Sequence, residues 1–208
     1  MEEEFISNIY NRISWINEIM RLLHEKLLQR LEGALKIVFM GIGEEKLTDD
    51  AFGPYVISEL LNYSNEKYLF INAGIVPMSR TDEIVDFQAS HLVLLDTCTL
   101  KKPPGTVAII ERKNIQEYVP ISTHTIPLHI IIDLLLDKLP DLTVFMIGVV
   151  PESLEGFTDL KLYKENEIPI EQRDENIDLP FFNINLTKTI QIVADQIIEI
   201  IKEIISKR

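Results

Sequence analysis

An α/β fold, with one sheet covered by helices on both faces, is the architecture that this sequence predicts. From residue 35 onward, short apolar runs typical of buried strands alternate with segments of helical periodicity, a pattern that argues for helices packed on a sheet. The connection over 96–105 is short and contains Pro103-Pro104-Gly105, which suits a hairpin and predicts one antiparallel strand. The 208 residues are enough for one domain with a proper core.

The chain begins with a candidate helix over 2–32. Its apolar residues step by three or four, which indicates a helix with one apolar side: Ile9, Ile13, Ile16, Met20, Leu23, Leu27 and Leu31. Gly33 is expected to end it. We expect this helix to pack on its own domain, against the Ile-rich last helix; contact with a second copy or a partner is the alternative.

The remaining elements follow in order. Strands are expected over 35–40, 68–72, 91–96, 105–111 and 142–149. Helices are expected over 53–63, 82–88, 126–138 and 185–207, with Thr81 as the cap of the second. Residues 160–180 are polar and irregular and are expected to form a loop or flap. We therefore divide the chain into an N-terminal helical extension, 1–34, and a single domain, 35–208.

Composition excludes several classes of function. The net charge of −13 disfavours nucleic acid and anionic membranes as partners. The single cysteine, Cys98, excludes an intrachain disulfide and fits a reducing compartment. The start Met-Glu-Glu-Glu is unlike a signal peptide, and no apolar run reaches the length of a membrane span. A cytoplasmic protein is expected.

Polar side chains occur where three apolar or helical segments end or begin. Asp50 follows the first strand within GIGEEKLTDDAFGP (41–54), Asp96 ends the run HLVLLD, and His124 lies in STHTIPLH (122–129), just before a helix. Ligands of open α/β sheets bind outside the carboxyl ends of the strands. Two carboxylates and one imidazole suit a borderline divalent ion with open coordination positions. The sequence therefore predicts a small metal site made of Asp50, Asp96 and His124.

Other interpretations of these residues stay open. Gly41 and Gly43 resemble a nucleotide-binding turn, but the third glycine is missing and the loop is acidic, which argues against phosphate. Asp49 is expected either to cap the following helix or to position a water, a task for which Glu44 is also a candidate. Asp96 could instead bond backbone amides of the next turn, and Cys98 could act as a nucleophile, although no histidine partner is evident near it.

Taken together, these segments resemble the hydrogenase maturation endopeptidases, which process the large subunit of [NiFe] hydrogenases. The resemblance covers about 35–157 and the last helix. It rests on the order and spacing of GIGEEKLTDDAFGP, AGIVP (73–77), DEIVDF (82–87), HLVLLDT (91–97), PPGTVAII (103–110) and STHTIPL (122–128). The Thr-His-x-x-Pro-Leu form resembles the branch that serves hydrogenase-3-like and related archaeal enzymes.

The resemblance implies a three-layer α/β/α sandwich around a mixed, mostly parallel sheet of about five strands, here with an extra N-terminal helix. It implies that Asp50, Asp96 and His124 bind or sense nickel, which the large-subunit precursor brings, and that the protein then removes the precursor's C-terminal tail. Zinc or cadmium could occupy the same site. Hydrolysis would be metal-assisted, and the protein would be a monomer or a weak homodimer.

Two departures from the family pattern bear on function. Glu44 stands where the family commonly has Asn, and the 2–32 helix and the 160–180 segment are additions.

Two rival functions are a non-catalytic nickel-sensing or chaperone module for the same precursor and an acid protease that uses Asp50 and Asp96 without metal. Cleavage activity separates the first rival from a protease, and insensitivity to chelators would favour the second.

Overall fold

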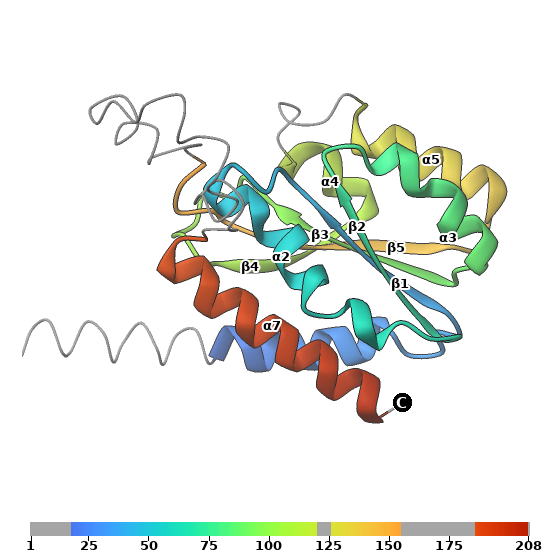
Figure 1. Ribbon diagram of the computed structural model, residues 1–208, viewed down its shortest axis with the longest axis horizontal. Helices are drawn as coiled ribbons and strands as arrows, with labels where there is room; N and C mark the ends of the chain where they lie inside the picture. The colour runs from blue at the N-terminus through green and yellow to red at the C-terminus, as the bar shows by residue number, and fades with distance from the viewer. Residues whose placement is uncertain (1–17, 120–125, 155–185, 208) are drawn as a thin grey trace, which may run out of the picture.

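Figure 1 shows the protein as a computed structural model, which describes residues 18–119, 126–154 and 186–207. A five-stranded sheet lies in the middle, with strand order β2-β1-β3-β5-β4. Its strands are β1 (Ile37–Ile42), β2 (Tyr68–Gly74), β3 (His91–Thr97), β4 (Val107–Glu111) and β5 (Thr143–Val149). The five expected strands are all present, with ends shifted by at most two residues.

Four neighbouring strands are parallel, and the last is antiparallel. β1 pairs in parallel with β2 and β3, β3 pairs in parallel with β5, and β4 pairs antiparallel with β5. The expected antiparallel strand is confirmed, but the expected hairpin is wrong. β5, which comes later in the chain, lies between β3 and β4, so the 98–106 connection passes over the end of β5 instead of forming a tight turn.

The alternation of side chains along the strands divides the core into two layers. In β1, Ile37 and Phe39 face one apolar cluster, whereas Val38, Met40 and Ile42 face the other, and all five are fully buried. A strand covered on both faces needs apolar residues at every position. This requirement explains the uninterrupted apolar runs in the sequence.

Helices cover both faces, as expected (Figure 1). On one face lie the N-terminal helix (residues 18–30), α2 (Phe52–Ser58) and α7 (Lys188–Lys207). On the other lie α3 (Thr81–Phe87), α4 (Arg112–Tyr118) and α5 (Leu128–Lys138). Short 3-10 helices, η1 (Thr48–Ala51), η2 (Leu61–Tyr63) and η3 (Pro77–Arg80), lie in the connections. The three-layer α/β/α sandwich is confirmed.

The N-terminal helix packs where the periodicity predicts. Its buried side chains share one apolar cluster with the Ile-rich side of α7, and Figure 1 shows the two helices side by side. These side chains are Met20, Leu23, Leu27 and Leu31. Gly33 ends the segment with φ +76°, a left-handed conformation that glycine adopts without strain.

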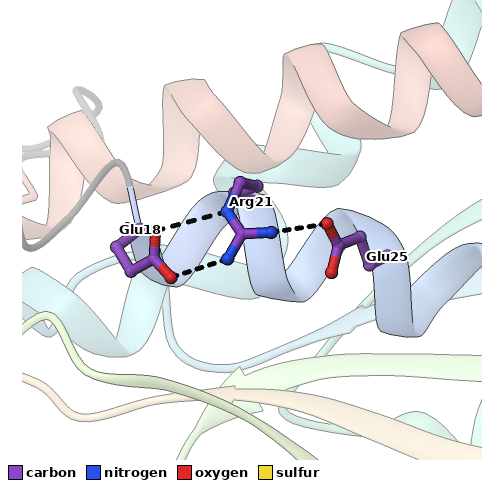
Figure 2. A network of polar contacts seen from close by, with 3 residues as sticks. All are labelled: Glu18, Arg21 and Glu25. Carbon is purple, nitrogen blue, oxygen red and sulfur yellow. Dashed lines mark hydrogen bonds and ion pairs between the residues drawn. The ribbon is translucent and has the colours of Figure 1, made fainter.

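The outer side of the N-terminal helix is charged. Arg21 donates to both carboxylate oxygens of Glu18, at 3.2 and 2.7 Å, and to Glu25 at 2.6 Å (Figure 2). These residues are spaced three and four apart, so they lie on one side of the helix. Arg21 lowers the pKa of Glu18. All three side chains are more than half exposed, so the network helps hydration of this side rather than adding much to stability.

Three details differ from expectation. α4 was not expected, because Ile115 is its one buried residue among those the structure describes and RKNIQEY shows little periodicity. Thr81 does not cap α3: its hydroxyl donates to the carbonyl of Met78, and Arg80 occupies the cap position. The helix expected over 53–63 breaks into α2 and η2. Residues 2–17 of the expected first helix and the expected 160–180 loop lie outside the described residues.

In the described parts of the chain, no helix combines the length and the apolar character needed to cross a membrane.

Candidate active site

The turn after β1 is built around close backbone contacts. A Cβ atom on Gly43, where φ is +139°, would lie 1.8 Å from the carbonyl oxygen of Asp50. A Cβ on Gly41 would lie 2.3 Å from the carbonyl oxygen of Gly53. The glycines therefore let η1 and α2 fold back onto the end of the strand. Their spacing reflects this packing.

Asp50 is buried at this turn, with 3% of its surface exposed. Its Oδ2 accepts a hydrogen bond from the backbone N–H of Glu44 at 2.8 Å. Its Oδ1 accepts one from the hydroxyl of Thr97 at 3.3 Å. The Asp50 carboxylate therefore points toward the end of β3.

Asp96 lies at that end of β3 and is 2% exposed. Its Oδ1 accepts a hydrogen bond from the backbone N–H of Thr97 at 2.7 Å. Thr97 therefore contacts both carboxylates, one through its backbone and one through its hydroxyl. The structure brings Asp50 and Asp96 to the same C-terminal edge of the sheet, as the sequence predicts.

Two buried carboxylates at the same edge of the sheet are costly unless donors or a cation compensate their charge. The backbone N–H groups of Glu44 and Thr97 supply part of that compensation. Carboxylate oxygens are common ligands of divalent ions. Within the described residues, no three His, Cys, Asp or Glu side chains form a group that could hold a metal.

The third predicted residue, His124, lies outside the described residues. The described flanks of its segment both pack on one face of the sheet. The carbonyl of Tyr118 accepts a hydrogen bond from the N–H of Thr99 at 2.7 Å. Val119 and Ile126 pack against the cluster that contains Cys98. The chain therefore leaves and re-enters the described structure on the face of the sheet that carries Cys98.

The Asp49 carboxylate is bound by other segments than those that bind Asp50 through Glu44 and Thr97. It is fully buried, and its carboxylate accepts hydrogen bonds from the backbone N–H groups of Glu152, Ser153 and Thr187 and from the Thr187 hydroxyl. The expectation that Asp49 caps α2 is wrong, because Ala51 holds that position without a side-chain bond. Asp49 instead holds the residue that precedes α7.

The Glu44 side chain turns away from Asp50. Its Oε1 accepts a hydrogen bond from the N–H of Lys46 at 3.2 Å, which closes a local turn of the loop. The backbone N–H of Glu44, not its carboxylate, reaches Asp50. The hydrogen bond to Asp50 therefore does not depend on which side chain residue 44 carries.

Cys98 is unsuited to nucleophilic attack. It is 1% exposed and packs against Gly148. Burial and, secondarily, the negative charge of Asp96 raise the pKa of the thiol to about 12. Because the thiolate is the nucleophile, the protonated Cys98 is a core residue at neutral pH.

Thr97 and Thr187 were not singled out from the sequence. Thr97 ends an apolar strand and looks like an ordinary strand residue. Thr187 carried a usable signal, because a threonine just before an apolar helix is a typical N-cap. Its hydroxyl accepts a hydrogen bond from the N–H of Ile190 at 3.5 Å.

The fold and this edge define a class: three-layer α/β/α proteins with a pair of buried carboxylates at the C-terminal end of a mostly parallel sheet. A model of the hydrogenase maturation protease family matches residues 54–172 of the chain, more than half of its length. The chain belongs to the hydrogenase maturation protease family. It is therefore a peptidase of that family.

Individual relatives agree with this assignment. A Methanocaldococcus jannaschii protein, provisionally named a hydrogenase maturation protease, is 36% identical over 141 residues, which cover 64% of this chain and 82% of the relative. The hydrogenase 3 maturation protease of Escherichia coli strain K12 is 25% identical over 120 residues, covering 58% of this chain and 75% of the relative.

Solved structures share the fold. The [NiFe] hydrogenase maturation protease HycI from Thermococcus kodakarensis aligns with a TM-score of 0.66 and 23% identity, covering 86% of this chain and 98% of that chain. The hydrogenase maturating endopeptidase HybD from E. coli aligns with a TM-score of 0.59 and 21% identity, covering 83% and 93%. At this identity the likeness establishes the architecture.

Proposed function

We propose that this protein is an endopeptidase that removes the C-terminal tail of a nickel-loaded [NiFe] hydrogenase large-subunit precursor. Family membership supports the activity, and the names of its relatives support the hydrogenase as the substrate. The observation that carries the proposal for this chain is the pair of buried carboxylates, Asp50 and Asp96, joined through Thr97. Burying two carboxylates costs folding free energy, and groups with such unfavourable environments are concentrated at functional sites.

The task we assign to these carboxylates is to bind the nickel that the precursor brings. Asp50 and Asp96 provide oxygen ligands, and His124 provides an imidazole two residues before the anchored Ile126. The donor set fits a borderline divalent ion such as nickel, and zinc or cadmium would fit the same ligands.

The residues of this chain orient the site before substrate arrives. Thr97 holds both carboxylates, and the Glu44 N–H fixes the second oxygen of Asp50. Oriented ligands avoid the free-energy cost of rearrangement during the reaction. A bound ion would polarise the scissile carbonyl and lower the pKa of a bound water. Because the ion arrives with the precursor, cleavage would occur only after nickel insertion, which makes it a checkpoint.

The remaining parts of the proposal concern context. We place the protein in the cytoplasm as a monomer or weak homodimer, in the hydrogenase-3-like and archaeal branch of the family. We retain the division into an N-terminal extension, 1–34, and a protease domain, 35–208. A metal-independent aspartic-type protease that uses Asp50 and Asp96 is the alternative mechanism.

Mass spectrometry of a nickel-loaded large-subunit precursor, with and without the protein, tests the function. We expect the wild type to release the tail from the loaded precursor and to leave the nickel-free precursor intact. Asp50→Asn and His124→Ala should abolish release, whereas Asp82→Asn, which removes an exposed carboxylate paired with Lys138, should not.

Two outcomes would change the proposal. Cleavage of the nickel-free precursor that persists in chelator would show the metal-independent mechanism. Stable binding of the loaded precursor without any cleavage would show that this chain is a nickel-sensing module rather than an active protease.

A further inference from the structure

The Asp49 carboxylate is saturated with hydrogen bonds. Oδ2 accepts from the N–H groups of Glu152 and Ser153, both at 2.8 Å, and from the Thr187 hydroxyl at 3.1 Å. Oδ1 accepts from the Thr187 N–H at 2.7 Å. A carboxylate has about four acceptor sites, so these contacts fill them. The donors from Glu44 and Thr97 that reach Asp50 come from other residues.

These contacts stabilise the charge of a fully buried carboxylate. Thr187 directly precedes α7, a helix of 20 residues, so Asp49 lies at the end of the helix that carries partial positive charge. Hydrogen bonds from N–H groups to a carboxylate are stronger than those between neutral groups. The carboxylate therefore ties together three parts of the chain: η1, the segment after β5, and the start of α7.

The backbone of η1 is held at the same point. The N–H of Asp49 donates to the carbonyl of Ser153 at 3.2 Å. Just before it, Thr48 has φ +35°, a conformation that is strained for a β-branched residue and persists only where the surroundings enforce it. Since η1 has only four residues, holding Asp49 fixes the direction in which its neighbour Asp50 points.

We infer that Asp49 is a positioning residue for the active site: by binding residues 152, 153 and 187, it orients η1 so that the Asp50 carboxylate faces Thr97 at the end of β3. The inference rests on the proposed function for its catalytic consequence. Its structural consequence, a fixed bond between Asp50 and the Glu44 N–H, stands independently of that function.

The test compares Asp49→Asn with Tyr55→Phe. Asn has the same size as Asp. Its amide NH2 group cannot accept hydrogen bonds, however, so it would face N–H donors that one of the Asp49 oxygens now binds. Tyr55 is a matched control, because its hydroxyl links α2 to α7 through Asp195 at 2.9 Å and Gln191 at 2.5 Å without contacting Asp50. Both variants remove hydrogen bonds between α7 and the rest of the protein, but only Asp49→Asn removes hydrogen bonds that hold η1 in place.

The activity-independent readout is the hydrogen-exchange rate of the Glu44 amide, measured by NMR on the full chain well below the unfolding temperature. We expect Asp49→Asn to raise this rate about tenfold or more, and Tyr55→Phe to change it less than about twofold. In the processing assay, Asp49→Asn should lower kcat about tenfold or more with little change in KM, because Asp50 is misplaced rather than removed.

The outcomes separate this inference from the proposed function. An unchanged Glu44 exchange rate in Asp49→Asn, or equal increases in both variants, would overturn the inference even if processing is confirmed. A faster Glu44 amide in Asp49→Asn alone would support it even if the wild type cuts no hydrogenase precursor. If Asp49→Asn fails to fold, Thr187→Ala, which removes the hydroxyl bond to Asp49 and the long 3.5 Å bond from the Ile190 N–H, carries the same comparison with a smaller expected increase.

Discussion

Adjacent residues with the same side chain do different work in this protein. Asp49 and Asp50 follow one another in η1, but one carboxylate binds the start of α7 and the other faces the end of β3. A turn of the 3-10 helix separates consecutive side chains by about 120°, which sends them to opposite surroundings. The two carboxylates therefore have different roles because they point in different directions, since both residues are aspartates and both are buried.

At the residue scale, Asp96→Asn should abolish processing and leave the fold intact. The Asn carbonyl can still accept the Thr97 N–H, but the negative charge that would bind the ion is lost. We expect processing to fall about 100-fold or more, with an unfolding temperature equal to or above that of the wild type, because a buried charge is removed. Mass spectrometry of the precursor and thermal unfolding measure the two effects.

Asp82→Asn serves as the control for the Asp96 variant, because the Asp82 side chain is 85% exposed. Near-wild-type processing by Asp96→Asn would remove Asp96 from the mechanism. An unfolded Asp96→Asn would mean that the carboxylate mainly supports the structure.

Cys98 gives a second prediction at this scale, which concerns pH. The pKa of its thiol is about 12 in the folded protein against an ordinary value of 9.0. Between these values the unfolded chain releases the thiol proton and the folded chain keeps it, so stability is complete below pH 9 and falls as the pH rises toward 12. One pKa unit corresponds to about 1.4 kcal/mol, so the loss amounts to a few kcal/mol.

Cys98→Ala should therefore show a shallower loss of stability in alkali, together with unchanged processing at neutral pH. Chemical denaturation at pH 7, 9 and 10.5 measures the slope. Loss of processing in this variant, or rapid alkylation of the wild-type thiol at neutral pH, would contradict the assignment of Cys98 to the core.

At the scale of elements, the position of α2 depends on the absence of a side chain at its start. A Cβ on Gly53 would lie 2.3 Å from the carbonyl oxygen of Leu95 and 2.5 Å from that of Ile42. The first turn of α2 therefore lies directly on the ends of β1 and β3. The same contact places η1, and with it Asp50, above the strand that carries Asp96.

Gly53→Ala should move α2 away from the sheet. Forcing a side chain into a packed core costs about 1–3 kcal/mol or more, so we expect a lower unfolding temperature and weaker processing. Ser58→Ala, at the far end of α2, removes a bond to the carbonyl of Tyr55 and should change neither by much. If Gly53→Ala behaves like Ser58→Ala, the close contact is not needed for the site.

At the scale of the whole molecule, the N-terminal helix completes one layer of the sandwich. Its described part shares one apolar cluster with α7, whose buried side chains include Ile197, Ile201 and Ile204. Each of its four buried side chains contributes about 1.5–3 kcal/mol, or about 6–12 kcal/mol together. That sum is comparable with the whole stability of an ordinary domain.

Deleting residues 1–33 should therefore lower the unfolding temperature strongly and promote aggregation, because the apolar side of α7 becomes exposed. The contacts of Asp50 with Glu44 and Thr97 involve no residue of the deleted segment and should survive where the truncated chain folds. Light scattering and thermal unfolding measure the effect. A truncated protein that is monomeric and equally stable, but inactive, would show that this helix docks the substrate instead.

The sequence alone determined the strands, the class of fold and the neighbourhood of Asp50 and Asp96. Uninterrupted apolar runs such as Ile37–Ile42 occur where a strand is covered on both faces, and the acids follow the runs whose carboxyl ends meet at one edge. Local pattern suffices for these features because burial acts on every second side chain of a strand and every third or fourth of a helix.

Tertiary structure alone decided the features that join distant segments. The order β3-β5-β4 depends on a strand that comes more than thirty residues after β4, so the short 98–106 connection could not reveal it. The role of Asp49 depends on Glu152, Ser153 and Thr187, which are 103 to 138 residues away in the chain. No local pattern distinguishes Asp49 from Asp50, because the partner that each carboxylate meets is set only when the sheet, η1 and α7 pack together.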